Sequence, residues 1–155
     1  KSFLIGGKYQ IPTLNEVFDL VDKKCLINIE LKGLATPNKV VALIEEYISE
    51  KNWNYNNFII SSFDWNMLQE TSNLNPNIPI GVLTEEDLSK ALAFAEKIKA
   101  KAIHPDFQLL NTENVSEMQK KGFLVLPWTV NSKEDIQKVK NYKVNGIISD
   151  NPDKI

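Results

Sequence analysis

Short apolar runs alternate along the chain with longer stretches in which apolar residues recur at helical spacing. The runs begin near residues 25, 58, 78, 101, 123 and 146, so from the second onward they recur every 20 to 23 residues. This interval is about the shortest that accommodates a strand and a helix covering it. Residues 58–60 and 123–126 are apolar without interruption, as is typical of parallel strands covered on both faces. The pattern therefore predicts an α/β fold with six parallel strands.

Signals for helix N-termini lie between these runs. Ser, Thr and Asp side chains accept hydrogen bonds from the free N–H groups of a first helical turn, and proline is favoured at the first helical position. The predicted caps are Thr13, Thr36 (followed by Pro37), Asp64, Thr84 together with Asp87, Thr112 and Ser132. Apolar residues at helical spacing follow each cap, which predicts one helix after each of them.

The order of the elements favours a barrel. Successive short strand–helix units, with no glycine-rich phosphate turn and no long crossover, favour a (β/α)8 barrel of the TIM type over a doubly wound sheet. A closed barrel typically needs about 250 residues and rarely fewer than about 200. We therefore expect residues 1–155 to form a single partial barrel domain of about six units, strands 3–8, with the N-terminal units missing. An open barrel exposes strand edges, so we expect the chain to self-associate unless a further N-terminal segment completes it.

Composition excludes some partners. The net charge of −2 gives no reason to expect nucleic acid or an anionic membrane surface, and no apolar run approaches the ~20 residues of a membrane span. All 18 basic residues are lysines, so an anion site must use lysine or backbone N–H groups. Cys25, the single cysteine, is expected to be a small buried hydrophobe. The sequence does not determine the cellular compartment of the protein, and the cytoplasm is favoured slightly over the periplasm.

One predicted strand carries charged residues on one of its faces. In residues 27–32, side chains alternate, so Asn28, Glu30 and Lys32 share a face. If that face lines a barrel, a carboxylate near the mouth can hold a hard divalent cation, and an ammonium one step outward can meet an anionic substrate oxygen. The alternative is a Glu–Lys ion pair in the polar end layer of the barrel, and the residues alone favour this alternative.

Other candidates also lie at the carboxyl ends of predicted strands, where parallel α/β proteins collect functional groups. Trp128 could form a flat wall for a small polyol or could pack in the core. His104, the only histidine, could donate to a phosphate, although a lone histidine before a proline is more often structural. Ser61 and Ser62 have no accompanying Ser–His–Asp arrangement, which argues against a nucleophile.

Seven segments, taken in order, resemble the glycerophosphodiester phosphodiesterase family across nearly the whole chain. They are IPTLNEVFDLV (11–21), INIELK (27–32), IISSFDWNMLQ (59–69), IGVLT (80–84), AIHPDF (102–107), VLPWTVN (125–131) and GIISDNP (146–152). The resemblance implies a barrel hydrolase that cleaves a small-molecule glycerophosphodiester to glycerol 3-phosphate and an alcohol, with a divalent metal ion such as Mg²⁺ or Ca²⁺. It also implies that Glu30 binds the metal, Lys32 the phosphate and Trp128 the glycerol end. Ser62 and His104 are looser matches to substrate-binding positions.

The chain also departs from the family pattern. The family's first strand carries His-Arg-Gly, its second Glu-x-Asp, and a His-Asp follows, and none of these occurs here. By resemblance, the acid and base histidines lie outside this chain, which holds no catalytic residue of its own. We therefore expect it to carry the substrate-binding side of the site and to be inactive alone. A non-catalytic phosphate- and glycerol-binding module is one alternative. A phosphoinositide-cleaving phospholipase barrel is another, although that group would be expected to bring an arginine.

Overall fold

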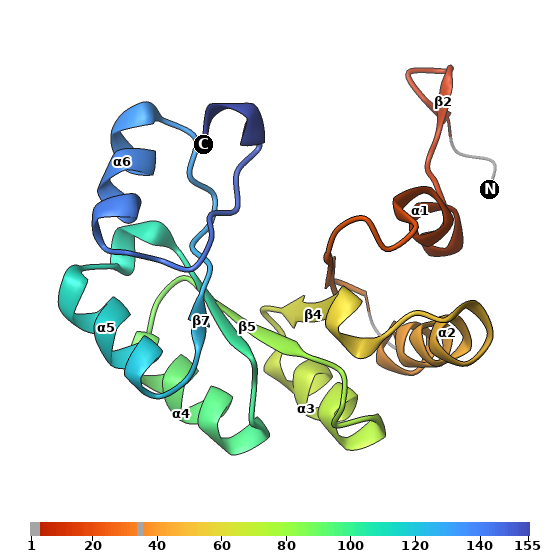
Figure 1. Ribbon diagram of the computed structural model, residues 1–155, viewed down its shortest axis with the longest axis horizontal. Coiled ribbons are helices and arrows are strands. Elements are labelled where there is room, and N and C mark those ends of the chain that lie inside the picture. The colour runs from red at the N-terminus through yellow and green to blue at the C-terminus, as the bar shows by residue number, and fades with distance from the viewer. Residues whose placement is uncertain (1–3, 34–35) are drawn as a thin grey trace.

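The computed structural model describes residues 4–33 and 36–155, and its main feature is a parallel sheet in which the strands follow their order in the sequence (Figure 1). The strands of this sheet are β3 (Ile27–Glu30), β4 (Phe58–Ser62), β5 (Ile80–Thr84), β6 (Ala102–Pro105) and β7 (Leu124–Val125). Before it lies a small antiparallel hairpin of β1 (Leu4–Ile5) and β2 (Tyr9–Gln10). In a doubly wound sheet the strand order reverses at a switch point, whereas here it does not. The prediction of an α/β fold of the barrel type is confirmed.

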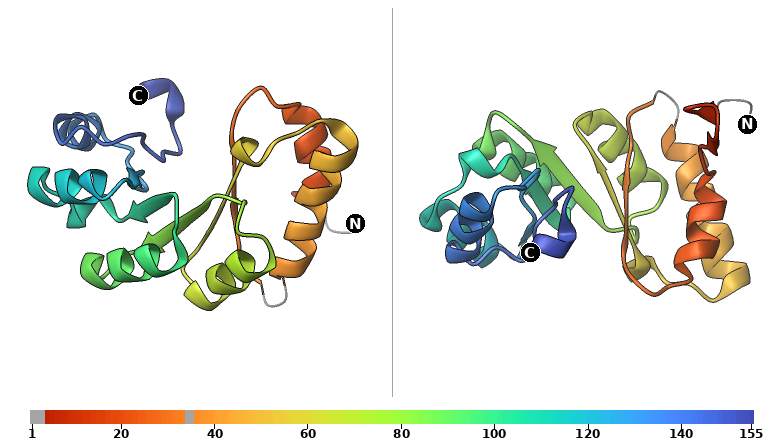
Figure 2. Two further views of the ribbon diagram at one scale, coloured as in Figure 1. Left: turned by 60° about the horizontal axis from the view of Figure 1, so that its bottom comes forward. Right: turned by 90° about the horizontal axis from the view of Figure 1, so that it is seen from above.

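The helices lie outside the sheet and form an arc around it, with α1 and α2 at one end and α6 at the other (Figure 2). They are α1 (Leu14–Val21), α2 (Thr36–Lys51), α3 (Trp65–Leu74), α4 (Leu88–Ile98), α5 (Thr112–Lys120) and α6 (Lys133–Asn141), with short 3₁₀ turns at Tyr55–Asn57, Phe107–Leu109 and Pro152–Lys154. No helix among these is long and apolar enough to cross a membrane. The arc leaves the inner face of the sheet free of helices, as in one part of a (β/α)8 barrel.

Strand register divides the residues of the sheet between two faces. Side chains of β4 and β5 such as Ile60 and Val82 pack against the helices in the main core. An aromatic cluster of Phe18, Tyr47 and Phe58 joins α1 and α2 to β4 there, with ring centroids 4.9 Å apart in two of its pairs. The other face is the inner, or lumen, face. Register partners Glu30, Ser61, Gly81 and Ala102 point into it, one from each strand from β3 to β6.

The prediction of a strand near residue 146 is wrong, because residues 145–148 do not form a regular strand. Residues 145–148 run beside the chain after β7, and the N–H of Ile148 donates to the carbonyl of Pro127 over 2.9 Å. A regular ladder fails for two reasons. Pro127 has no N–H to donate, and the N–H of Val125 is taken by the side-chain oxygen of Asn145. The segment therefore continues the sheet without forming a strand.

Most predicted caps are confirmed. Thr13, Asp64, Asp87 and Ser132 each accept a backbone N–H at the start of their helices. Asn111, not Thr112, caps α5, because its side chain and that of Asn114 form a reciprocal capping box.

Two further corrections concern Thr84 and Cys25. Thr84 ends β5 and is no cap, and Cys25 is exposed because it lies before β3 begins. Thr36 is the first residue of α2, and the residue preceding it lies outside the described part of the chain.

Gly81 makes room for the imidazole of His104 on the lumen face. A Cβ at position 81 would lie 2.5 Å from Nε2 and 2.6 Å from Cε1 of that ring. Gly81→Ala is therefore expected to lower the free energy of unfolding by about 1–3 kcal/mol, the usual range for overpacking, as measured by urea denaturation. In a His104→Ala background the same substitution should have almost no effect. An equal loss of stability in both backgrounds would show that the strain has another source.

Candidate active site

Residues from both edges of the sheet line one cavity at the carboxyl ends of the strands. The cavity has a volume of about 270 Å³ and is lined by Asn28, Glu30, Lys32, Ser61, Phe63, Leu83, Trp128, Thr129 and Ile148. Glu30 ends β3 at one edge, whereas Trp128 follows β7 at the other. Side chains from opposite edges can share a cavity only if the sheet curves strongly, as it does in a barrel. The curvature thus creates the site.

Glu30 and Lys32 lie together at the mouth of this cavity. The Nζ of Lys32 is 3.4 Å from Oε2 of Glu30, and the two side chains are 77% and 31% exposed respectively. This is the ion pair that the sequence offered as the alternative to a functional role. An ion pair exposed to this degree contributes little stability, so an anionic ligand can replace the carboxylate as the partner of the ammonium at small cost. The geometry is compatible with both roles.

Trp128 is held in position as one wall of the cavity. Its Nε1–H donates to the backbone carbonyl of His104 over 2.8 Å, so the polar atom of the indole is already bonded. The ring of Phe63 meets it edge-on, with centroids 5.2 Å apart and planes at 90°. What Trp128 offers a ligand is therefore an apolar surface with a fixed orientation.

The adjacent serines Ser61 and Ser62 differ in orientation. The Ser62 hydroxyl donates to the carbonyl of Leu31 over 2.7 Å and accepts the N–H of Asp64, so backbone groups already occupy it. Ser61 is fully buried and lines the cavity, and its Oγ has no hydrogen-bond partner within residues 4–33 and 36–155. Sequence reasoning selected Ser62 as a substrate-binding candidate. The signal that could have found Ser61 is register, because Ser61 pairs with Glu30 and so shares its face.

His104 lies on the lumen face but is not among the residues that line the cavity. It is 1% exposed, and neither ring nitrogen has a partner among the described residues. Burial lowers the pKa of the imidazole to about 4, since a charged ring would lose its hydration. The side chain is therefore neutral at neutral pH, and its substrate-binding role stays a prediction. Its backbone carbonyl supports Trp128.

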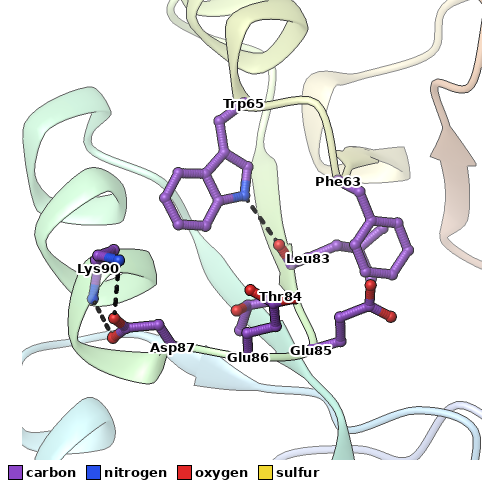
Figure 3. Close-up of a pocket in the computed structure, with 8 residues that line it drawn as sticks. All are labelled: Phe63, Trp65, Leu83, Thr84, Glu85, Glu86, Asp87 and Lys90. Carbon is purple, nitrogen blue, oxygen red and sulfur yellow. Dashed lines mark hydrogen bonds and ion pairs between the residues drawn. The ribbon is translucent and has the colours of Figure 1, made fainter.

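A second cavity lies over the neighbouring rim of the sheet and shares Phe63 and Leu83 with the first (Figure 3). It has a volume of about 310 Å³ and is lined by Phe63, Trp65, Leu83, Thr84, Glu85, Glu86, Asp87 and Lys90. Its best-defined contacts are structural. Asp87 accepts the N–H of Lys90 as the cap of α4, and this bond lowers the pKa of the Asp87 carboxyl. Trp65 donates to the carbonyl of Leu83 over 2.9 Å.

The described residues do not by themselves fit a tightly held divalent cation. Residues 4–33 and 36–155 contain no cluster of three or more carboxylate, histidine or cysteine side chains placed to hold a metal ion. Mg²⁺ and Ca²⁺ take about six to eight oxygen ligands, several of them from carboxylates or carbonyls. Glu30 supplies one carboxylate to this cavity. No chemical step in this chain can therefore be assigned to a metal.

Comparison with known sequences gives one consistent result. The model of the glycerophosphoryl diester phosphodiesterase family matches residues 3–154. A glycerophosphodiester phosphodiesterase of Caldanaerobacter subterraneus is 35% identical over 152 residues, which cover 94% of this chain and 60% of the relative. One from Bacillus subtilis is 31% identical over 153 residues, covering 93% and 52%. The chain thus spans between half and two thirds of the length of these curated relatives.

Solved structures agree with the sequence relatives. An Oleispira antarctica phosphodiesterase in complex with the product sn-glycerol-3-phosphate superposes with a TM-score of 0.80 at 25% identity, over 94% of this chain and 60% of that one. A glycerophosphodiester phosphodiesterase from Parabacteroides distasonis gives 0.81 at 17% identity, over 99% and 66%, which supports the fold. With the family match extending over nearly all of its residues, this chain belongs to the glycerophosphoryl diester phosphodiesterase family.

Proposed function

We propose that this chain forms the phosphate- and glycerol-binding side of an active site that hydrolyses glycerophosphodiesters. In that reaction water adds to phosphorus, the bond from phosphorus to the leaving alcohol breaks, and glycerol 3-phosphate and an alcohol are released. The observation that carries the proposal is the cavity in which Glu30, Lys32 and Trp128 converge. The Oleispira antarctica relative, which was solved with sn-glycerol-3-phosphate, supports the choice of ligand.

Each of the three residues has a distinct role in this proposal. The ammonium of Lys32 donates to a phosphate oxygen and offsets its charge. Glu30 contributes one carboxylate to a divalent cation, Mg²⁺ or Ca²⁺, whose remaining ligands come from groups other than those described here. Trp128 covers the carbon atoms of the glycerol moiety. The leaving alcohol is then directed away from Trp128.

Among the described residues, no histidine lines this cavity. His104 is the sole histidine, and it is buried outside the lining of the cavity. In the proposal, the two histidines that exchange protons with the attacking water and the leaving alcohol are therefore supplied from outside this chain. This division of roles also keeps the non-catalytic binding module as a second candidate, because a single carboxylate is a weak metal site.

One experiment tests both parts of the proposal. The purified 155-residue chain should bind sn-glycerol 3-phosphate in a calorimetric titration but should not release choline from glycerophosphocholine, with or without added Mg²⁺ or Ca²⁺. Metal-dependent turnover by the chain alone would contradict the external histidines. Failure to bind glycerol 3-phosphate would contradict the ligand assignment.

A fusion protein distinguishes between the two candidate functions, the enzyme and the non-catalytic binding module. The part of the Caldanaerobacter subterraneus relative that lies outside its match to this chain is joined to residues 1–155. Turnover by the fusion supports the enzyme. Ligand binding without turnover, in a fusion that melts cooperatively, supports the binding module.

A further inference from the structure

Three buried side-chain polar atoms have no hydrogen-bond partner among the described residues, and all of them lie on the lumen face. They are Oγ of Ser61 and the two ring nitrogens of His104. A buried polar group without a partner is destabilising, and such groups are rare enough in folded proteins that each calls for an explanation. Of these two side chains, Ser61 lines the cavity that contains Glu30 and Lys32. Its free hydroxyl can therefore meet a ligand there.

The position of Ser61 defines the kind of ligand group it can meet. Ser61 is the register partner of Glu30, so it lies at the same level of the lumen, whereas Lys32 is two residues further toward the mouth. The Nζ of Lys32 lies 3.4 Å from Oε2 of Glu30, and the Lys32 side chain is the more exposed of the two, so it can meet a ligand at the mouth. The ammonium attracts an anion and can donate hydrogen bonds to its oxygens, so the phosphate is placed nearer the mouth, beside Lys32.

A neutral hydroxyl suits the deeper position. A serine Oγ–H both donates and accepts, as does an alcohol group of a ligand, so the two can bond without any charge being buried. Asn28 lies two residues before Glu30 on the same face of β3 and also lines the cavity. Its carboxamide, like a hydroxyl, can both donate and accept hydrogen bonds. The indole of Trp128 covers the carbon atoms alongside.

We propose that Ser61 is a specificity-determining residue of this site and that its hydroxyl binds a hydroxyl group of the glycerol moiety. This inference rests on the proposed function, because it assumes that a glycerol phosphate occupies the cavity. The hydroxyl groups are what distinguish glycerol phosphate from a plain alkyl phosphate. A site that bonds a ligand hydroxyl rejects an analogue without it, since the buried protein group is then left unpaired.

The test removes the two interacting hydroxyls separately and together. The full chain and its Ser61→Ala variant are titrated by NMR with sn-glycerol 3-phosphate, 3-hydroxypropyl phosphate and propyl phosphate, which carry two, one and no glycerol hydroxyls. The unaltered chain should prefer glycerol 3-phosphate to propyl phosphate by roughly 3- to 10-fold, the effect of one net hydrogen bond. Ser61→Ala should reduce this preference to less than about 2-fold while leaving the affinity for propyl phosphate unchanged.

A matched control is available in Ser89, an exposed serine of α4 outside this cavity. Ser89→Ala should keep the full preference. Ser61→Ala removes a hydroxyl that has no partner in the described part of the chain, so the variant should fold normally. Its binding of propyl phosphate would demonstrate this directly.

The remaining outcomes each overturn a defined statement. A preference that survives in Ser61→Ala overturns the role of Ser61 and leaves the proposed function intact. An equal loss of affinity for all three ligands assigns Ser61 to the phosphate and overturns the hydroxyl contact. If the unaltered chain binds none of the three, the proposed function itself fails, and this inference fails with it.

Discussion

Lys32→Ala is expected to lower kcat/KM for glycerophosphodiesters by on the order of 10²-fold, the scale on which one positioned electrostatic contact acts in an active site. The assay requires an active polypeptide that carries this chain. The side chain lies at the mouth of the cavity, and its present partner is an exposed carboxylate 3.4 Å away, which a phosphate can replace. Affinity for sn-glycerol 3-phosphate should fall in parallel, since the phosphate contact exists in substrate and product alike.

Lys120→Ala provides the matched control. Lys120 is an exposed lysine in the last turn of α5, and Lys120→Ala removes the same charge away from the cavity. It should leave both kcat/KM and ligand affinity within about 2-fold of the unaltered values. If Lys32→Ala behaved like Lys120→Ala, Lys32 would be no more than the partner of Glu30 in a surface ion pair.

The second large effect concerns stability at acid pH. Burial holds the pKa of His104 at about 4 in the folded chain, against 6.5 for a free imidazole. Between these values the unfolded chain binds more protons, so stability is fully present above pH 6.5 and falls as the pH is lowered toward 4. The expected loss is roughly 3 kcal/mol, measured as the free energy of unfolding in urea at a series of pH values.

His104→Gln isolates this contribution. His104 is the only histidine of the chain, so the variant has no imidazole that can titrate in this window, whereas its carboxylates are unchanged. The variant should lose much less stability between pH 6.5 and 4 than the unaltered chain does. Parallel stability curves for the two proteins would mean that the imidazole is hydrated in the folded state.

Much of the fold could be predicted because local pattern and tertiary packing agree. Runs such as 58–60 and 80–83 carry no polar side chain on either face, and the structure buries every residue of β4 and β5. The segment near 146 has a similar apolar pattern. Its pairing depends on Pro127 and on the side chain of Asn145, which no periodicity reveals. Cys25 is exposed, contrary to the prediction, for a related reason: the apolar run that contains it begins before β3 does.

The candidate site was predictable where alternation within one strand was sufficient. Glu30 and Lys32 fall on one face by simple counting, and the structure places both at the same cavity. Choosing between Ser61 and Ser62 requires knowing which residue of β4 lies opposite Glu30, and that register is set by the packing of two strands. The burial of His104 likewise depends on the absence of a side chain at Gly81, on the neighbouring strand.

The most direct measurement is a crystal structure of the chain with sn-glycerol 3-phosphate bound. The account predicts the phosphate within hydrogen-bonding distance of Nζ of Lys32, with the glycerol carbons against the indole of Trp128. A ligand seated elsewhere, with Lys32 still paired to Glu30 and touching no ligand atom, would contradict it.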